Sequence, residues 1–165
     1  MESALEGITL GEKIQNNLSV GSLFWILGAS YLIVKGEPDI ALKYTMKGLN
    51  IMEELKYQNG IAICLSFISH IYLYKGDLYL ALEYCKKSLS NNEISDNAKA
   101  ITLHTLGGIY RENGELQKAL KYYKQGILLS EELGNTTLLI AFLTRIGTTY
   151  RMVGNHEKAL KYITR

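Results

Sequence analysis

Apolar and polar positions along the chain follow the period of an α-helix, interrupted at regular intervals by glycine. In LGGIYRENGELQKALKYY, residues 106–123, apolar residues recur every three to four positions on both sides of Gly114, as on one face of a helix. Glycine readily takes the left-handed conformation that ends a helix, and the acidic Glu115 that follows suits the start of another. The stretch therefore predicts two helices joined by a short turn.

This two-helix pattern occurs four times. It returns as IGTTYRMVGNHEKALKYI at 146–163, as ISHIYLYKGDLYLALEYC at 68–85, and as LGASYLIVKGEPDIALKYT at 27–45, the last with one extra residue between Tyr31 and Gly36. Two columns keep the same spacings of 40, 38 and 40 residues, namely the turn glycines Gly36, Gly76, Gly114 and Gly154 and the second-helix alanines Ala41, Ala81, Ala119 and Ala159. A fixed period of this length predicts an array of stacked helix pairs.

Small residues recur at fixed positions on both helices of each copy. They are Gly28, Ser69, Gly107 and Gly147 on the first helices and Gly48, Ser88 and Gly126 on the second. Side chains this small let helix backbones approach closely, and a tyrosine column fills the adjoining space: Tyr44, Tyr84, Tyr122 and Tyr162. Gly108 belongs to no column, so it is either a gap in a binding surface, where a ligand backbone approaches, or a tolerated surface glycine.

The pattern resembles the tetratricopeptide repeat family. The resemblance is carried by Leu106, Gly107, Tyr110, Gly114, Ala119, Tyr123 and Gly126 and by their equivalents in the other copies. The period near 40 exceeds the usual 34 residues, and the usual proline after the second helix is absent. The repeats are therefore more similar to those of kinesin light chains or of peptide-sensing bacterial regulators. The resemblance implies an all-α, right-handed α-solenoid of antiparallel helix pairs.

We expect one repeat domain over residues 1–165. It divides into a leading unpaired helix at 1–17 and repeats at 18–57, 58–95, 96–134 and 135–165, the last truncated. EGITLGEKIQNN at 6–17 matches QGILLSEELGNT at 125–136, so the chain is expected to begin within a second helix and to be a segment of a longer array. Exposed terminal faces would then favour self-association.

Composition and charge indicate the expected cellular compartment and the expected classes of partner. Apolar residues make up 47% and charged residues 21%, as in folded soluble proteins, and the net charge is only +2. Glutamates intersperse the lysines of the second helices, so we expect no nucleic-acid partner. Leu18–Val34 is uncharged, and we expect a buried or groove-lining helix there and no membrane. Two cysteines without metal-type spacing suggest a reducing compartment, the cytoplasm.

We expect neither catalysis nor a cofactor. The glycines lack the spacing of a dinucleotide or triphosphate loop and follow no strand. His70 and His104 lie on adjacent first helices, but no carboxylate or cysteine is placed to complete a metal site. Cys64 and Cys85 fit small core positions, and no base stands at a defined spacing from a nucleophile.

The expected function is that of a non-catalytic scaffold binding a peptide or protein segment in a concave groove lined by the first helices, as the resemblance implies. The candidate groove residues are Trp25, Ile33, Ser66, His70, Tyr74, His104, Arg111, Thr144, Thr148 and Arg151. The first half of this predicted groove is lined by aromatic and aliphatic side chains, and its second half carries arginines. This combination suits an apolar ligand with an acidic group. The chaperone-type carboxylate clamp is not expected, because Ser66, His104 and Thr144 stand where its lysines would be. The alternative is a structural segment that oligomerises through its terminal helices.

Overall fold

The computed structural model describes residues 2–13, 17–90 and 94–165, and within them the chain is helical with no strand. It forms two compact units, an N-terminal unit, Met1–Ile94, and a C-terminal unit, Ser95–Arg165. The N-terminal unit contains α1 (Glu2–Lys13), α2 (Asn17–Ser30), η1 (Tyr31–Lys35), α3 (Pro38–Glu54), α4 (Gln58–Tyr74) and α5 (Leu78–Leu89). The C-terminal unit contains α6 (Asp96–Glu112), α7 (Leu116–Glu132), α8 (Thr136–Met152) and α9 (His156–Ile163).

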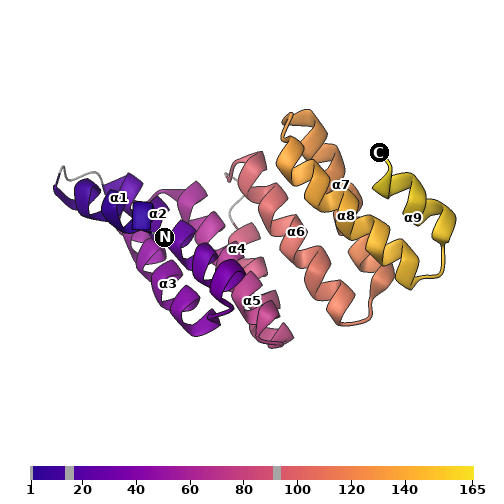
Figure 1. Ribbon diagram of the computed structural model, residues 1–165, viewed down its shortest axis with the longest axis horizontal. Helices are drawn as coiled ribbons and strands as arrows, with labels where there is room; N and C mark the ends of the chain where they lie inside the picture. The colour runs from indigo at the N-terminus through magenta and orange to yellow at the C-terminus, as the bar shows by residue number, and fades with distance from the viewer. Residues whose placement is uncertain (1, 14–16, 91–93) are drawn as a thin grey trace. The chain divides into compact units, whose positions relative to one another are not determined.

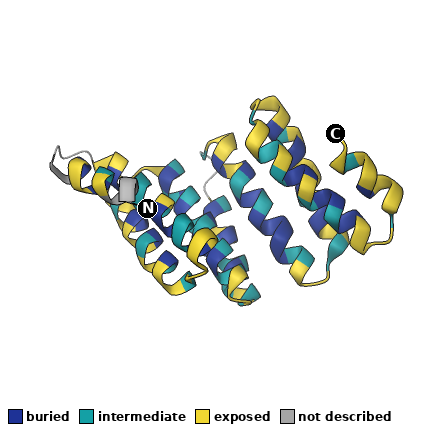
Figure 2. Cartoon of the chain, viewed as in Figure 1, coloured by how far each residue is buried: buried dark blue, intermediate teal, exposed yellow. Residues whose placement is uncertain are grey.

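Consecutive helices pack side by side within each unit (Figure 1). The pairs α2–α3, α4–α5, α6–α7 and α8–α9 follow the four sequence copies, which confirms the all-α solenoid of helix pairs. The right-handed sense, the repeat borders and the single domain stay predictions. In the C-terminal unit, buried residues lie along α6, α7 and α8, whereas α9 is mostly exposed (Figure 2).

The predicted small-residue contacts are present. A Cβ on Gly28 would overlap Thr45 Oγ1, one on Gly107 would overlap the Tyr123 ring, and one on Gly126 would overlap the Phe142 ring. Ser69, at the position of Gly28, instead donates its hydroxyl to the Ala81 carbonyl at 2.6 Å. These glycines are packing residues, because each leaves room for an atom of the adjacent helix.

Each turn glycine ends its helix in the left-handed conformation, with φ from +67° to +80° at Gly36, Gly76, Gly114 and Gly154. The residues that follow these glycines differ in whether their side chains cap the next helix. Asp77 and Asn155 accept a backbone N–H through their side chains, whereas Glu37 and Glu115 make no such bond. Helix termination by glycine is therefore common to all four pairs, but side-chain capping is not.

The extra residue of the first copy is accommodated inside its helix. Tyr31–Lys35 forms one π-helical turn, which takes up a single inserted residue without breaking the helix. Ile33 and Val34 within this turn are 73% and 71% exposed. The insertion therefore places two large apolar side chains on the surface of the N-terminal unit.

A stacked tyrosine pair joins the two helices of every repeat. The ring centroids lie 5.3–5.5 Å apart, with interplanar angles of 9–16°, in Tyr31–Tyr44, Tyr72–Tyr84, Tyr110–Tyr122 and Tyr150–Tyr162. Offset or near-parallel ring pairs at this separation stabilise the contact beyond their buried area. The predicted role of the second-helix tyrosines in packing is confirmed.

One described helix, Asn17–Lys35, is long and apolar enough to cross a membrane. Core helices of soluble proteins and signal sequences satisfy the same criterion. Val20, Leu27 and Gly28 are buried, and Gly28 contacts α3 directly. These contacts give α2 a packing role in the N-terminal unit, as predicted from its small residues.

Candidate functional site

The candidate residues of the N-terminal unit lie on α2, η1 and α4. Trp25 and His70 are partly buried and both contact Phe67, at ring-centroid distances of 6.4 Å and 6.0 Å. Phe67 thus links the two predicted residues, although the sequence pattern did not single it out. The aromatic side chains of α2 and α4 form one partly exposed cluster.

Ile33 and Tyr74 lie near the C-terminal ends of η1 and α4, where they are 73% and 59% exposed. The Tyr74 hydroxyl approaches the turn at Gly36, 3.4 Å from the position a Cβ would take there. This end of the unit therefore offers an exposed apolar surface.

Ser66 differs from the other candidates because it has no exposed surface. Its hydroxyl has no hydrogen-bond partner among the described residues. His104, at the same repeat position, is partly exposed, and its ring packs against Phe142 and Tyr123. The Ser66 side chain is therefore not available to a ligand, and the function proposed below does not use it.

The candidates of the C-terminal unit lie on α6 and α8. The His104 ring meets Phe142 edge-on at 5.4 Å, and Arg111 donates from Nε and Nη2 to Glu112 Oε1 at 3.1 Å and 2.7 Å. Thr144 is exposed and Thr148 partly buried, and each hydroxyl donates to a carbonyl of its own helix. These threonine hydroxyl protons are therefore already engaged.

Arg151 is exposed near the end of α8. Gly108 on α6 is buried, so it is not a surface glycine, and as it lies in the structure it is not exposed to a ligand backbone either.

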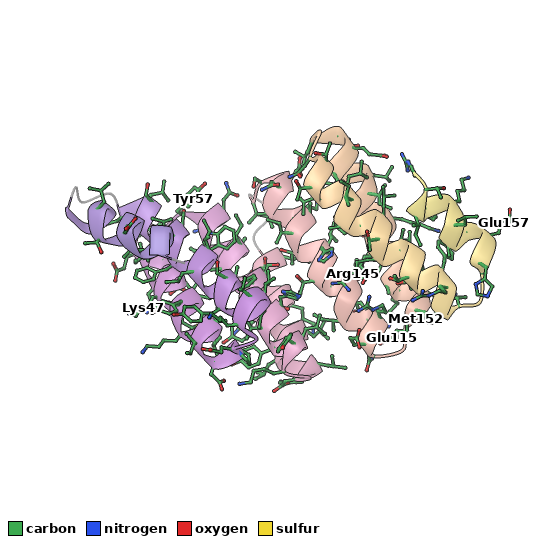
Figure 3. All side chains as sticks on the ribbon, in the orientation of Figure 1. Lys47, Tyr57, Glu115, Arg145, Met152 and Glu157 are labelled. Carbon is green, nitrogen blue, oxygen red and sulfur yellow. The ribbon has the colours of Figure 1, made fainter. Side chains whose placement is uncertain are left out.

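Sequence reasoning missed two groups in the C-terminal unit, Arg145 and the Tyr123 hydroxyl. Arg145 on α8 is partly buried and projects beside α6 (Figure 3). Its spacing from Thr148 and Met152, three and seven residues on, places all three on one helical face and is a signal that could have found it. Tyr123 on α7 was assigned to packing, and no sequence signal shows where its hydroxyl lies.

The Tyr123 hydroxyl is close to charged groups of the neighbouring helices. Burial raises the pKa of this phenol, the guanidinium groups of Arg111 and Arg145 oppose the rise, and Glu112 adds to it. The raised pKa keeps the hydroxyl protonated and neutral near pH 7.

The lysines of the second helices also contact tyrosine rings. Lys47, Lys87, Lys118 and Lys158 place their ammonium groups 5.1–5.8 Å from tyrosine ring centroids. Such contacts are cation–π interactions. They associate the lysines with the stacked tyrosine pairs, an arrangement that the sequence analysis did not anticipate.

Groups suited to metal binding or nucleophilic chemistry do not assemble in the described part of the chain. No cluster of three or more His, Cys, Asp or Glu residues is placed to hold a metal ion there. Burial raises the pKa of both Cys64 and Cys85 to about 12, so both remain thiols near neutral pH. Their environment fits the predicted role as core residues.

Comparisons with known proteins agree on the kind of fold. Sequence models of the tetratricopeptide repeat match residues 98–165 and 64–94, together more than half of the chain. No curated protein sequence matches the chain.

Among solved structures, BtubC (BKLC) from P. vanneervenii is similar with a TM-score of 0.68 and 17% identity, over 89% of this chain. The match spans 61% of the length of BtubC. A Podosopora anserina protein described as a putative kinesin light chain with nearly identical TPR-like repeats gives a TM-score of 0.60 at 14% identity, over 99% of this chain and 82% of its own. A substituted variant of the same fungal protein gives 0.63 at 14% identity, over 99% of this chain and 81% of its own.

Tetratricopeptide repeats generally mediate protein–protein interactions and typically serve as non-enzymatic scaffolds. The repeat columns, the helix pairs and these matches lead to one assignment. This chain belongs to the tetratricopeptide repeat family.

Proposed function

We propose that the chain is a non-catalytic, cytoplasmic interaction module that binds a peptide or protein segment on the first helices of its repeats. The observation that carries this proposal is the group of three arginines on α6 and α8, Arg111, Arg145 and Arg151, two partly buried and one exposed. Arg111 is already paired with Glu112, but Arg145 is partly buried and makes no ion pair among the described residues. An acidic ligand would compensate its charge, because a partly buried cation without an anion is unfavourable.

The N-terminal unit supplies a surface of different chemistry. Trp25, Phe67 and His70 form its aromatic cluster, and Ile33 and Tyr74 form its exposed apolar end. Exposed apolar surface of this kind is typical of protein-binding sites. Each unit thus has its own ligand preference, apolar in the first and acidic in the second.

Reversing two arginine charges is expected to weaken binding of an acidic partner. Polypeptides retained from a native lysate by the parent protein would be identified, and each would be remeasured in purified form by calorimetry. We expect the double variant Arg111→Glu, Arg151→Glu to bind at least about tenfold more weakly, because two ligand-facing charges change sign. Its helical circular dichroism and melting temperature should show that it remains folded.

A matched control separates local from overall charge. Lys121→Glu with Lys161→Glu makes the same change in net charge on exposed positions of α7 and α9. Equal loss of affinity in both double variants, or no loss in the arginine variant, would contradict binding at this face.

We infer a second candidate function, self-association through α9. Leu160 and Ile163 are 64% and 59% exposed, and Leu128 of α7 is 61% exposed. One repeat earlier, the equivalents of the two α9 residues, Leu120 and Tyr123, are 4% and 0% exposed. Side chains that are core in one repeat are thus left on the surface in the next, where a second copy would cover them.

Self-association through this face predicts oligomers that dissociate on dilution and are lost in Leu160→Lys. Sedimentation velocity over a concentration series measures this, with Lys161→Ala as the control on the same helix. A monomeric parent, or an oligomer unaffected by Leu160→Lys, would exclude the mechanism.

A further inference from the structure

A surface pocket of about 410 Å³ lies in the C-terminal unit, where the turn between α6 and α7 comes beside the end of α8. Its lining residues are Gly114, Glu115, Leu116, Gln117, Lys118 and Val153. Figure 3 labels Glu115 and Met152, the last residue of α8, at this end of the unit. Gln117 and Val153 are exposed, so a ligand can reach the pocket from solvent. Its volume is in the range of about 300–1,000 Å³ that is usual for ligand sites.

The corresponding place in the N-terminal unit is bridged by an ion pair. In the repeat register, Val153 corresponds to Lys75 and Gln117 to Asp39. Lys75 Nζ and Asp39 Oδ1 lie 2.7 Å apart, which joins the end of α4 to the start of α3. Val153 and Gln117 carry no charges and cannot form such a bridge. The pocket therefore lies where the C-terminal unit lacks the ion pair of the N-terminal unit.

The charged groups of the pocket wall neutralise each other. Lys118 forms an ion pair with Glu115, and its ammonium group lies 5.1 Å from the centroid of the Tyr110 ring. Asn113 Nδ2 donates to the other carboxylate oxygen of Glu115 at 2.7 Å. The hydrogen bond between Lys118 and Glu115 lowers the pKa of the carboxyl and raises the pKa of the ammonium, so both are ionised near pH 7. The wall has no net charge and favours an uncharged ligand.

The remaining lining groups are apolar side chains and one carboxamide. Leu116 and Val153 supply the apolar side chains, and a Cβ on Gly114 would meet no atom within 4 Å, so the space there is open. The Gln117 carboxamide makes no hydrogen bond among the described residues. A carboxamide both donates and accepts, which matches the N–H and C=O groups of a peptide backbone. The pocket therefore suits an apolar side chain with a peptide group beside it.

We propose that this pocket binds a neutral peptide segment through one large apolar side chain. The side chain would pack against Leu116 and Val153, and removal of its surface from water would supply most of the affinity. The Gln117 carboxamide would bond the adjoining peptide group and fix its direction. The site is formed by turns, whereas the proposed function uses the first helices, so neither depends on the other.

Four small peptides test the pocket. Acetyl-phenylalanine methylamide is the probe, acetyl-alanine methylamide lacks the large side chain, and the lysine and glutamate methylamides carry a charge. NMR titration of the whole chain follows the methyl resonances of Leu116 and Val153. We expect the phenylalanine probe to bind in the millimolar range and to shift both resonances. The other three should bind at least about tenfold more weakly, because they bury less apolar surface or lose hydration of a charge without a partner.

Transfer of the ion pair from the N-terminal unit should close the pocket. The double variant Gln117→Asp, Val153→Lys leaves the net charge unchanged, and we expect it to bind the phenylalanine probe at least about tenfold more weakly, followed at Leu116. Its helical circular dichroism should match that of the parent. The matched control makes the reverse exchange in the N-terminal unit, Asp39→Gln with Lys75→Val, and should leave the affinity measured at Leu116 unchanged.

Gln117→Ala tests the carboxamide alone at an exposed position, so the fold is expected to remain intact. We expect about fivefold weaker binding of the phenylalanine probe, as for loss of one hydrogen bond. Parent-like affinity in this variant or in the folded double variant would overturn the proposal. Unshifted Leu116 and Val153 methyl resonances at millimolar probe, or equal or tighter binding of the alanine peptide or of a charged one, would also overturn it.

Discussion

Phe142→Ala is expected to lower the free energy of unfolding of the C-terminal unit by about 3–5 kcal/mol. Phe142 has no exposed surface, and its ring fills the space that Gly126 leaves by lacking a Cβ. The ring also contacts Tyr123 at 6.3 Å and His104 at 5.4 Å, so truncation leaves a cavity lined from three helices. Cavities of this kind collapse only partly, which adds to the loss of apolar burial.

Urea unfolding followed by circular dichroism measures this effect, with Ile140→Ala as the control. Ile140 lies on the same helix but is 63% exposed, so its truncation should change stability by well under about 1 kcal/mol. Similar losses in the two variants would show that Phe142 does not hold α6, α7 and α8 together. The double variant Gly126→Ala, Phe142→Leu should be more stable than the sum of the two single losses, because the smaller side chain makes room for the new Cβ.

Ala119→Leu is expected to lower the free energy of unfolding by about 1–3 kcal/mol. Ala119 begins the buried face of α7 and has no exposed surface. Leucine adds three carbon atoms at a position where every repeat has alanine, and neighbouring side chains would have to leave their favoured rotamers to admit them.

Lys121→Ala is the control for Ala119→Leu, because Lys121 is exposed on the same helix. Its substitution should leave the thermal midpoint nearly unchanged. Equal midpoints for the two variants would contradict the close helix contact that the alanine column predicts.

Local features of the sequence were sufficient to predict the helix pairs. Helical periodicity and a left-handed glycine act within a few residues, so each pair is identifiable without knowledge of its neighbours. Four copies in register then indicated which positions must be small, and the contacts at Gly28, Gly107 and Gly126 confirm them. The inserted residue after Tyr31 was also visible in the sequence, but the sequence did not predict that a π-helical turn accommodates it.

Candidate ligand-binding residues were harder to predict, because accessibility depends on side-chain size and direction across several helices. The repeat register selected Ser66 together with His104 and Thr144, yet Ser66 has no exposed surface. The same register assigned Tyr123 to the core, which is correct for its ring but says nothing of its hydroxyl.

The sequence by itself determined the repeat, its helix pairs, the glycine helix ends and the small contact positions, since each depends on local conformation or on one residue's volume. The tertiary structure alone decided that the Tyr123 hydroxyl of α7 lies near Arg111 of α6 and Arg145 of α8 without a protein partner among the described residues. That proximity joins three helices. It depends on the direction and length of each side chain in the packed unit, which no periodicity along the chain encodes.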